Sequence, residues 1–425
     1  MARLKEYNGH YCESEYEYAF IGFLEAEGWK YSSGNNIHRV TKRDVLIADD
    51  FKKFIADTNP DLTEDEVTQI YDNVRLVGAE SNFATLHKVY GWMVNGVQFT
   101  SQDGLPRMIS LIDFDNWDKN IFRVVNQFTV EYTNNGQKEN RRPDVLLFVN
   151  GMPLCVVELK NPVDANATIY DAWEQINIRY WRDIPHLLHY CPLACISDGV
   201  KTRLGTVRTP YEHFYAWRRV NEGDVVSTLP FAETETMIKG VYTPERFVEI
   251  FRDYIYFQDS IYDSDEVEIV CRYPQFFAAK LLKQSIVNSV VTRSGKGGTY
   301  FGATGCGKTY TMAFLARQLA LRCTDIPEIG SPTIILIVDR DELQKQGSNL
   351  FTKSKEFLNL GEVSVVKNRT QLRQELGARQ SGGFYICTIQ KFCDREDDKI
   401  GLINDRQNII CFSDEAHRTQ LEHSK

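Results

Sequence analysis

The stretch Arg141–Lys160, RRPDVLLFVNGMPLCVVELK, decides how the first half of the chain folds. Two runs of aliphatic and β-branched residues flank Asn150-Gly151, a dipeptide typical of a tight turn between antiparallel strands. The sequence therefore predicts a buried β-hairpin. It begins at a carboxylate, Asp144, and ends with Glu158 and Lys160. Because charges at the ends of buried strands are costly unless something pairs with them, we expect a cation and a phosphodiester at this end.

The residue types at this end fit metal-dependent hydrolysis of a phosphodiester. Asp144 and Glu158 can bind Mg²⁺, a hard cation that prefers oxygen ligands. A metal held there would activate water and neutralise charge at the phosphate. Lys160 would position the water or stabilise the developing negative charge. The alternative is an ordinary strand pair with polar ends, because the D…ExK pattern is loose.

The register of the hairpin decides whether Asp144 can join the other two residues. Glu158 and Lys160 are two apart on a strand and therefore share a face. A strict two-residue turn at Asn150-Gly151 would pair Asp144 with Val157 and place it on the wrong face. A three-residue loop, residues 150–152, would pair it with Glu158. We therefore predict an odd-length loop or an equivalent bulge.

Size and charge set broad limits on the protein. At roughly 150 residues a domain, 425 residues suggest two or three domains, and the 43% hydrophobic content is ordinary for a globular protein. The net charge of -9 argues mildly against general nucleic-acid binding but not against a local basic channel. Eight arginines lie in one part of the chain, although each alone is more typical of a solvated surface. They are Arg141, Arg142, Arg179, Arg182, Arg203, Arg208, Arg218 and Arg219.

The cysteine pattern and the hydropathy indicate a cytoplasmic protein. Ten cysteines are scattered without a zinc-site or disulfide framework, so we expect reduced thiols. The first twenty residues are polar and do not resemble a signal peptide. No apolar run approaches the roughly 20 residues needed to span a bilayer, so no membrane partner is expected.

The chain divides into three expected regions. Residues 1–235 carry a strand-rich core with helices before and after it, which predicts an α/β domain. Residues 236–270 hold a helical connector. In residues 271–425, strands at 333–339, 363–367, 384–389 and 408–414 alternate with helices. These strands are continuous apolar runs, which is typical of a doubly wound parallel sheet covered on both faces.

A phosphate-binding loop opens the last region. Gly302–Thr309 fits G-x-x-x-x-G-K-[ST], and we expect it to follow a short strand and to open a helix. In the loop Gly302, Thr304, Gly305 and Gly307, backbone N–H groups would close around phosphate oxygens. Lys308 would reach the terminal phosphates of ATP, and Thr309 would offer its hydroxyl to Mg²⁺. The alternative is a flexible glycine-rich turn.

A second acidic motif, Asp414-Glu415-Ala416-His417, follows the last apolar run. A carboxylate at the C-terminal edge of a parallel strand lies where such sheets bind ligands. Asp414 would hold the Mg²⁺ of the nucleotide, and Glu415 would orient or deprotonate the attacking water.

The order of these motifs resembles that of superfamily 2 helicases and translocases. The P-loop is followed by IVDRDEL, TIQ and DEAH. The resemblance implies that Arg340-Asp341 and Thr388–Gln390 touch nucleic acid or couple it to the nucleotide. It also implies that Gln275, in RYPQ, contacts adenine, with an ordinary surface glutamine as the competing interpretation.

The hairpin resembles the core of PD-(D/E)xK nucleases. That resemblance implies that a Glu of the first helix helps the metal site; Glu17 fits best, and Glu13 and Glu15 compete for the role. The family commonly carries Gln-x-x-x-Tyr after this strand, whereas here Gln175 is followed by Tyr180, five residues on. Five residues span roughly 140° on an α-helix, so we expect the two side chains to lie on different faces. Gln175 remains a candidate site residue, whereas for Tyr180 both simple packing and the role of the family tyrosine stay open.

An N-terminal nuclease joined to a superfamily 2 motor is similar to the R subunit of type I restriction-modification enzymes. VVELKNP, DIPHLLHY, ISDGVKTRLGT, EHFYAW and DEAHRTQ add to the resemblance. It implies ATP-dependent translocation and Mg²⁺-dependent cleavage of unmethylated double-stranded DNA, together with methylation and specificity subunits. Because Lys425 follows DEAH so closely, we expect a chain truncated before the second motor lobe.

Two other interpretations remain open. One is a motor of a repair or type III-like system, in which we would expect the nuclease to follow the motor. The other is an N-terminal domain that binds DNA without cutting it, which intact Asp144, Glu158 and Lys160 disfavour.

Overall fold

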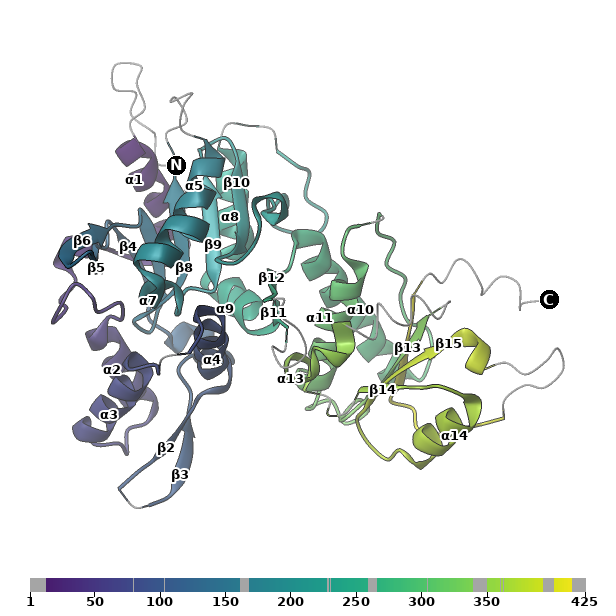
Figure 1. Cartoon of the computed structure of the whole chain (residues 1–425). Coiled ribbons are helices and arrows are strands. Elements are labelled where there is room, and N and C mark those ends of the chain that lie inside the picture. Colours follow the sequence, from purple (N-terminus) through teal and green to yellow (C-terminus); the bar gives the residue numbers. More distant parts are fainter. Residues whose placement is uncertain are drawn as a thin grey trace. The chain divides into compact units, whose positions relative to one another are not determined.

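The computed structural model describes residues 13–414 except 79, 103, 161–167, 228, 230, 259–265, 304, 339–349, 360, 362 and 393–400. The chain divides into two compact units (Figure 1). The first comprises Met1–Ile255 with Glu268–Val270, and the second comprises Tyr256–Val267 with Cys271–Lys425. The predicted class of mixed α/β domain followed by a parallel-sheet lobe is confirmed.

A mixed six-stranded sheet forms the centre of the first unit, in the order β1-β4-β7-β8-β9-β10. The β1/β4 and β8/β9 pairs are parallel, and the other pairs are antiparallel. Every residue of the two central strands is buried, which explains their unbroken apolar sequence. The strands are β1 (Lys30–Ser33), β4 (Phe122–Asn126), β7 (Val145–Val149), β8 (Met152–Leu159), β9 (Leu193–Ser197) and β10 (Thr202–Thr206).

The β7–β8 hairpin reaches the required register through a bulge. Asn150 and Gly151 have φ of 50° and 75°, and they form a two-residue turn that pairs Val149 with Met152. The predicted three-residue loop is therefore wrong. The register then shifts between Leu147 and Phe148, and beyond the shift Val145 pairs with Val157. Continued by one residue, this register sets Asp144 opposite Glu158, so the alternative of an equivalent bulge is confirmed.

Helices cover opposite faces of this sheet. Successive strand residues point to opposite faces, and the register pairs Glu158 with Ile196 and Leu159 with Ser197. The Ser197 hydroxyl contacts Tyr16 of α1, at 2.6 Å, whereas Glu158 contacts Tyr180 of the later helix. The helices and turns of this unit are α1 (Glu13–Ala26), η1 (Gly34–Asn36), α2 (Ala48–Thr58), α3 (Glu64–Arg75), α4 (Asn82–Asn95), η2 (Trp117–Lys119), α5 (Ile169–Glu174), η3 (Gln175–Tyr180), α6 (Trp181–Asp183), α7 (Pro185–Leu188), η4 (Tyr211–His213), α8 (Ala232–Val241) and α9 (Pro244–Asp253).

The region predicted as a helical connector does not form a separate body. Its helices α8 and α9 belong to the first unit, because their apolar faces pack there. Phe247 and Phe251 of α9 are fully buried, and Trp29 donates a hydrogen bond of 2.6 Å to the carbonyl of Tyr242, between the two helices. The short strands β11 (Ile255–Phe257) and β12 (Glu268–Val270) follow at the boundary of the units.

Two further hairpins complete the first unit. They are β2 (Val97–Thr100) with β3 (Pro106–Ile109), and β5 (Val130–Asn134) with β6 (Gln137–Arg141). The β5–β6 hairpin leaves the main sheet because Gln127, just after β4, has a left-handed φ of 51°. Among the described helices, none is long and apolar enough to cross a membrane.

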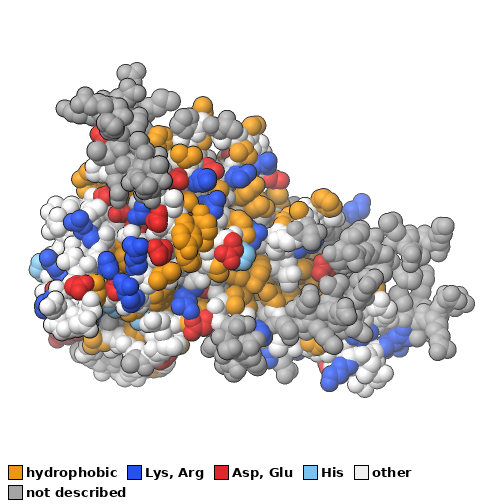
Figure 2. Space-filling model, turned by 45° about the horizontal axis from the view of Figure 1, so that its top comes forward, with side chains coloured by type: hydrophobic (Ala, Val, Ile, Leu, Met, Phe, Trp, Pro, Cys, Tyr) orange, Lys and Arg blue, Asp and Glu red, His pale blue; other side chains and the backbone are white. Residues whose placement is uncertain are grey.

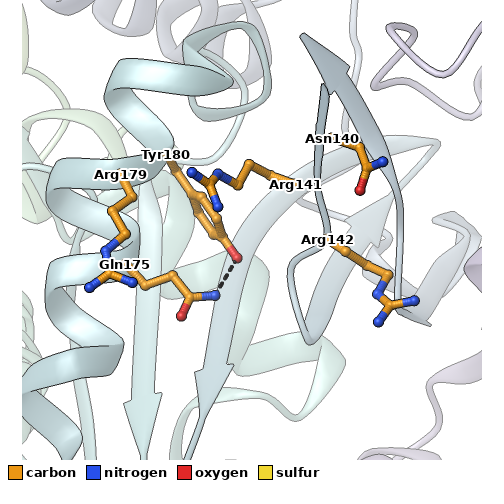
Figure 3. Close-up of a pocket in the computed structure, with 6 residues that line it drawn as sticks. All are labelled: Asn140, Arg141, Arg142, Gln175, Arg179 and Tyr180. Carbon is orange, nitrogen blue, oxygen red and sulfur yellow. Dashed lines mark hydrogen bonds between the residues drawn. The ribbon is translucent and has the colours of Figure 1, made fainter. Parts of the chain in front are cut away.

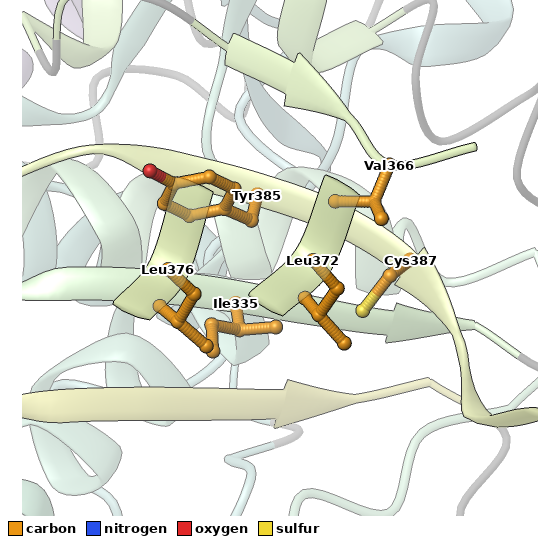
Figure 4. Close-up of a cluster of buried hydrophobic side chains, with 6 residues drawn as sticks. All are labelled: Ile335, Val366, Leu372, Leu376, Tyr385 and Cys387. Atoms are coloured by element: carbon orange, nitrogen blue, oxygen red, sulfur yellow. The ribbon is translucent and has the colours of Figure 1, made fainter. Parts of the chain in front are cut away.

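The second unit contains a four-stranded, all-parallel sheet in the order β14-β15-β13-β16. Figure 4 shows α14 packed on one face through a buried cluster that includes Ile335, Leu372 and Tyr385. On the other face Phe384 stacks on Phe351, with 4.6 Å between ring centroids. Both faces are therefore covered, as predicted. The elements are α10 (Tyr273–Thr292), α11 (Lys308–Leu321), β13 (Thr333–Val338), α13 (Lys355–Leu358), β14 (Val363–Val365), α14 (Arg369–Ala378), β15 (Phe384–Thr388), η6 (Ile389–Lys391) and β16 (Ile409–Ser413).

The strand expected ahead of the phosphate-binding loop is not formed. Residues 293–303 contain no strand, and Phe301 is 95% exposed. This segment reads RSGKGGTYFGA, and its glycines favour irregular backbone over an extended strand. The expected helix does follow, because α11 begins at Lys308.

Candidate active site

The charged end of the β7–β8 hairpin brings Asp144, Glu158 and Lys160 together. Asp144 is 9% exposed and accepts a 2.8 Å hydrogen bond from the backbone N–H of Leu159, next to Glu158. Glu158 is fully buried and accepts a 2.5 Å hydrogen bond from the Tyr180 hydroxyl. Lys160 donates to the Gln175 carboxamide oxygen at 3.1 Å. Glu158 and Lys160 thus both face η3, as their two-residue spacing predicts.

The surroundings of the two carboxyl groups disfavour their charged forms. Burial raises the pKa of Asp144 above its ordinary value. Burial, and then the negative charge of Asp144, raise the pKa of Glu158 well above its ordinary value, while Lys160 acts in the opposite direction. Glu158 Oε2 is buried and has no hydrogen-bond donor among the described residues. The pair therefore favours one retained proton unless a cation compensates its charge.

A π-helical turn joins Gln175 to Tyr180 and corrects the sequence-based expectation. Residues Gln175–Tyr180 form a π-helix between α5 and α6, so residues five apart lie nearly one above the other. Gln175 Nε2 donates to the Tyr180 hydroxyl at 2.8 Å, and Figure 3 shows both side chains turned to the same side. The expectation that they lie on different faces is wrong, because it assumed 3.6 residues a turn.

Tyr180 is consequently part of the site. Burial and the Glu158 carboxylate raise the pKa of Tyr180 well above its ordinary value, so the phenol keeps its proton and donates it. A continuous path of hydrogen bonds runs from Lys160 through Gln175 and Tyr180 to Glu158. The sequence did carry a signal for this: the Gln-to-Tyr spacing is five residues and not the family's four, which a one-residue insertion absorbed by a π-turn would explain.

Glu17 lies away from the carboxyl pair. Its carboxylate accepts hydrogen bonds from Asn126 and Gln127, both at 2.6 Å. Asn126 pairs with Val145, which pairs with Val157, so this side chain points to the face opposite Glu158. The described residues also hold no group of three or more His, Cys, Asp or Glu side chains that could bind a metal. The structure therefore does not bring Glu17, or the competing Glu15, to Asp144 and Glu158.

The donor set at the hairpin fits a magnesium ion. Asp144 and Glu158 supply adjacent carboxylate oxygens, and one of these, Glu158 Oε2, lacks a donor among the described residues. Mg²⁺ is commonly held by only one or two carboxylates, with water and substrate phosphate completing its octahedral shell. A divalent cation between these two groups would replace the retained proton and remove their repulsion.

The phosphate-binding loop occurs at the start of α11, as predicted. Gly305 and Gly307 have positive φ of 79° and 82°, which L-residues with side chains rarely adopt. Lys308 donates to the carbonyl of Gly302 at 3.4 Å. The helix N-terminus and its free N–H groups provide favourable potential for an anion.

Gln275 supports this loop from α10. It is 3% exposed, so the competing interpretation as a surface glutamine is wrong. Its amide nitrogen donates to the carbonyl of Gly307 at 3.1 Å, and its oxygen accepts from the N–H of Arg272. A Cβ on Gly307 would lie only 2.4 Å from Gln275 Nε2, which explains the glycine there.

The remaining motif residues are only partly described. Asp414 directly follows β16, and its N–H bonds the carbonyl of Ile337 on β13, so it lies at the C-terminal edge of the sheet. Thr388 ends β15, and Gln390 lies in η6 beside it. Thr304, Arg340-Asp341 and Glu415 lie outside the described residues.

Comparison with known proteins gives one family match for each part of the chain. Residues 11–213 match the family described as "Type I restriction enzyme R protein N terminus", and residues 274–425 match the SWI2/SNF2 ATPase family. The chain therefore has a segment similar to the N-terminal domain of type I restriction R proteins, followed by a segment similar to SWI2/SNF2 ATPases. The first matched segment holds the carboxyl pair and η3, and the second holds the phosphate-binding loop.

Curated relatives extend this likeness over nearly the whole chain. The HindI type I restriction endonuclease subunit of Haemophilus influenzae is 29% identical over 96% of the chain. The putative MjaIXP endonuclease subunit of Methanocaldococcus jannaschii is 30% identical over 95%, and the SauCOLORF180P subunit of Staphylococcus aureus is 28% identical over 74%. The chain spans only 39% of the length of the first two relatives.

Proposed function

We propose that this chain is the nuclease and ATP-binding part of a type I restriction subunit. In this proposal it cleaves unmethylated double-stranded DNA with Mg²⁺ and takes part in ATP-dependent translocation. The observation that carries the proposal is the convergence of Asp144, Glu158 and Lys160 at one end of the hairpin. The names of the relatives, which are type I endonuclease subunits, support it.

The side chains would divide the chemistry among them. Asp144 and Glu158 would hold Mg²⁺, which when bound supplies an activated water and neutralises charge at the phosphate. Lys160 would stabilise the negative charge that develops on the phosphate oxygens. Gln175 would hold the Lys160 amine in place, and Tyr180 would orient the Glu158 carboxylate by donating to Oε1. Glu17 would act only indirectly, by fixing the end of β4 through Asn126 and Gln127.

The ATPase segment would bind the nucleotide at the start of α11. The loop Gly302, Thr304, Gly305 and Gly307 would surround the phosphates, Lys308 would neutralise the terminal phosphates, and Gln275 would contact adenine from beneath the loop. Thr309 and Asp414 would hold the Mg²⁺ of the nucleotide, and Glu415 would orient the attacking water.

The partners would be duplex DNA and the methylation and specificity subunits of the same complex. The order of the domains, with the nuclease ahead of the motor, favours this assignment over a type III-like arrangement. The expected cytoplasmic location stays a prediction.

The test is Lys160→Ala in the full-length subunit, assembled with its methylation and specificity subunits. Loss of the lysine should abolish cleavage of unmethylated plasmid DNA while DNA-stimulated ATPase activity persists. Lys201→Ala, at an exposed position in the β9–β10 turn, is the matched control and should cut normally. Cleavage that is unchanged in Lys160→Ala would instead favour a domain that binds DNA without cutting it.

A further inference from the structure

A basic hollow of about 390 Å³ lies beside the carboxyl pair in the first unit. Figure 3 shows that its lining comes from two sides, with Gln175, Arg179 and Tyr180 on the helix and the others at the end of β6. Its six lining residues are Asn140, Arg141, Arg142, Gln175, Arg179 and Tyr180. Three of them are arginines and none is acidic, which is a lining that favours an anion.

Two of these arginines already bond carboxylates, although Asp183, the partner of Arg141, is shared with Arg182. Arg141 bonds Asp183 through two nitrogens, at 2.7 and 2.6 Å, and Arg179 bonds Glu174 at 2.7 Å. Arg142 is exposed and makes no hydrogen bond or ion pair with the residues that the structure describes. Its electrostatic effect falls on Asp144, two residues along the chain. Within the described part of the chain, Arg142 is therefore the arginine of this hollow that has no carboxylate partner.

The hollow also shares residues with the proposed cleavage site. Gln175 and Tyr180 line it, and the same two side chains bond Lys160 and Glu158. An anion in the hollow would thus lie next to the phosphodiester being cut. Figure 2 shows basic and acidic side chains interspersed on the face that it presents, so a local arrangement, and not a uniformly positive surface, has to select the anion.

We propose that this hollow binds a DNA backbone phosphate adjacent to the scissile one, with Arg142 as its principal ligand. Arginine suits this role because its planar guanidinium can donate two parallel hydrogen bonds to phosphate oxygens. Asn140 and Arg179 would add donors from the two sides. The inference rests on the proposed function, since it takes duplex DNA as the ligand.

The experiment measures binding of a fluorescein-labelled DNA duplex by fluorescence anisotropy over a series of salt concentrations, with the 425-residue chain. Each neutralised phosphate contributes a slope of about -0.9 to log affinity against log salt. Arg142→Gln should weaken binding and make this slope shallower by about that amount. Between 50 and 200 mM salt, the variant should therefore lose about threefold less affinity than the wild type. Arg142→Lys should keep the slope but bind more weakly, because lysine keeps the charge and loses the planar guanidinium that donates two parallel hydrogen bonds.

Arg218→Gln is the matched control, because Arg218 is also exposed but lies outside the hollow. It should retain the wild-type affinity and slope. An unchanged slope in Arg142→Gln would overturn the proposal, as would an equal decrease in both variants. Equal melting temperatures of the variants and the wild type exclude a folding defect.

Two further measurements distinguish a DNA phosphate from a free anion, and the phosphate site from the proposed nuclease function. Inorganic phosphate that raises the melting temperature of the wild type but not of Arg142→Gln, with DNA binding unaffected, would indicate a site for free anions and overturn the proposal. Asp144→Asn tests the proposed function separately, through cleavage by the assembled complex. If that variant still cuts DNA while Arg142→Gln has a shallower slope, the proposed function fails and the phosphate site stands.

Discussion

At the scale of single residues, the site includes side chains that the sequence alone did not identify. Asp144, Glu158 and Lys160 could be selected from residue type and spacing, because a metal and a phosphate impose both. Tyr180 could not, because its contact with Glu158 depends on a non-standard helical turn. Arg142 could be counted among the arginines, but only the structure distinguishes it from Arg141 and Arg179, which have carboxylate partners.

The first prediction concerns the cost of burying Glu158. Its folded-state pKa is raised above the value in an unfolded chain, so the stability it contributes is present below the unfolded pKa and is lost as pH rises. Glu158→Gln removes this pH-dependent loss of stability because the amide does not ionise, and the amide oxygen can still accept a hydrogen bond from Tyr180. The variant should therefore melt at a higher temperature than the wild type at pH 7. Each pKa unit of the shift corresponds to about 1.4 kcal/mol.

The check is thermal unfolding of the first unit at pH 7 and near pH 4, with and without Mg²⁺. The advantage of Glu158→Gln should shrink toward pH 4, where the wild-type carboxyl is protonated in the folded state and largely protonated in the unfolded state. Mg²⁺ should stabilise the wild type more than the variant. Glu212→Gln, at an exposed position, should show neither effect. A variant that melts lower at pH 7 but not at pH 4 would contradict this account.

At the scale of elements, two local irregularities, a bulge in a strand and a π-turn in a helix, bring the site residues together. The hairpin has one extra residue in β8, Leu154, which shifts the register so that Asp144 faces Glu158. The helix has a π-turn that brings Gln175 beneath Tyr180. The need for a bulge could be predicted, because the chemistry required one register. Its place could not, because a loop of three residues satisfies the same requirement.

The second prediction tests the π-turn. Deleting Ile178, which is 47% exposed, should convert residues 175–180 to an α-helix without rotating the helix on either side. The tyrosine would then lie four residues after Gln175 and remain on its face. We expect a change of about 1 kcal/mol or less in the free energy of unfolding, with stabilisation by Mg²⁺ retained.

The control deletion removes Gln69, an exposed residue of the regular helix α3. Each residue turns an α-helix by about 100°. The deletion should therefore rotate Ile70, Tyr71 and Val74 out of the core and cost at least about 3 kcal/mol. Urea unfolding of both deletion variants measures the difference. Equal destabilisation would show that the π-turn is not an absorbed insertion.

At the scale of the whole molecule, the order of motifs was the most informative feature of the sequence. The hairpin, the phosphate-binding loop and the acidic motif follow one another as in a nuclease joined to a motor, and the family matches agree. The boundary between the units was harder to foresee. The sequence of helices α8 and α9 is also compatible with a helical connector. Only buried contacts, such as that of Trp29 with Tyr242, assign these helices to the first unit.

The last prediction is that the two units respond separately to their ligands. At fixed Mg²⁺, ATP at about 100 times its Kd should stabilise the second unit by about 2.7 kcal/mol, which raises its melting temperature by roughly 5–10 °C. Lys308→Ala should lose this shift, because the amine that would neutralise the terminal phosphates is gone. Asp144→Asn should keep it, because Asp144 belongs to the other unit. Scanning calorimetry of the three proteins measures both transitions. A persistent ATP shift in Lys308→Ala would mean that the nucleotide binds elsewhere, and a shift lost in Asp144→Asn would mean that the two sites are coupled within the chain.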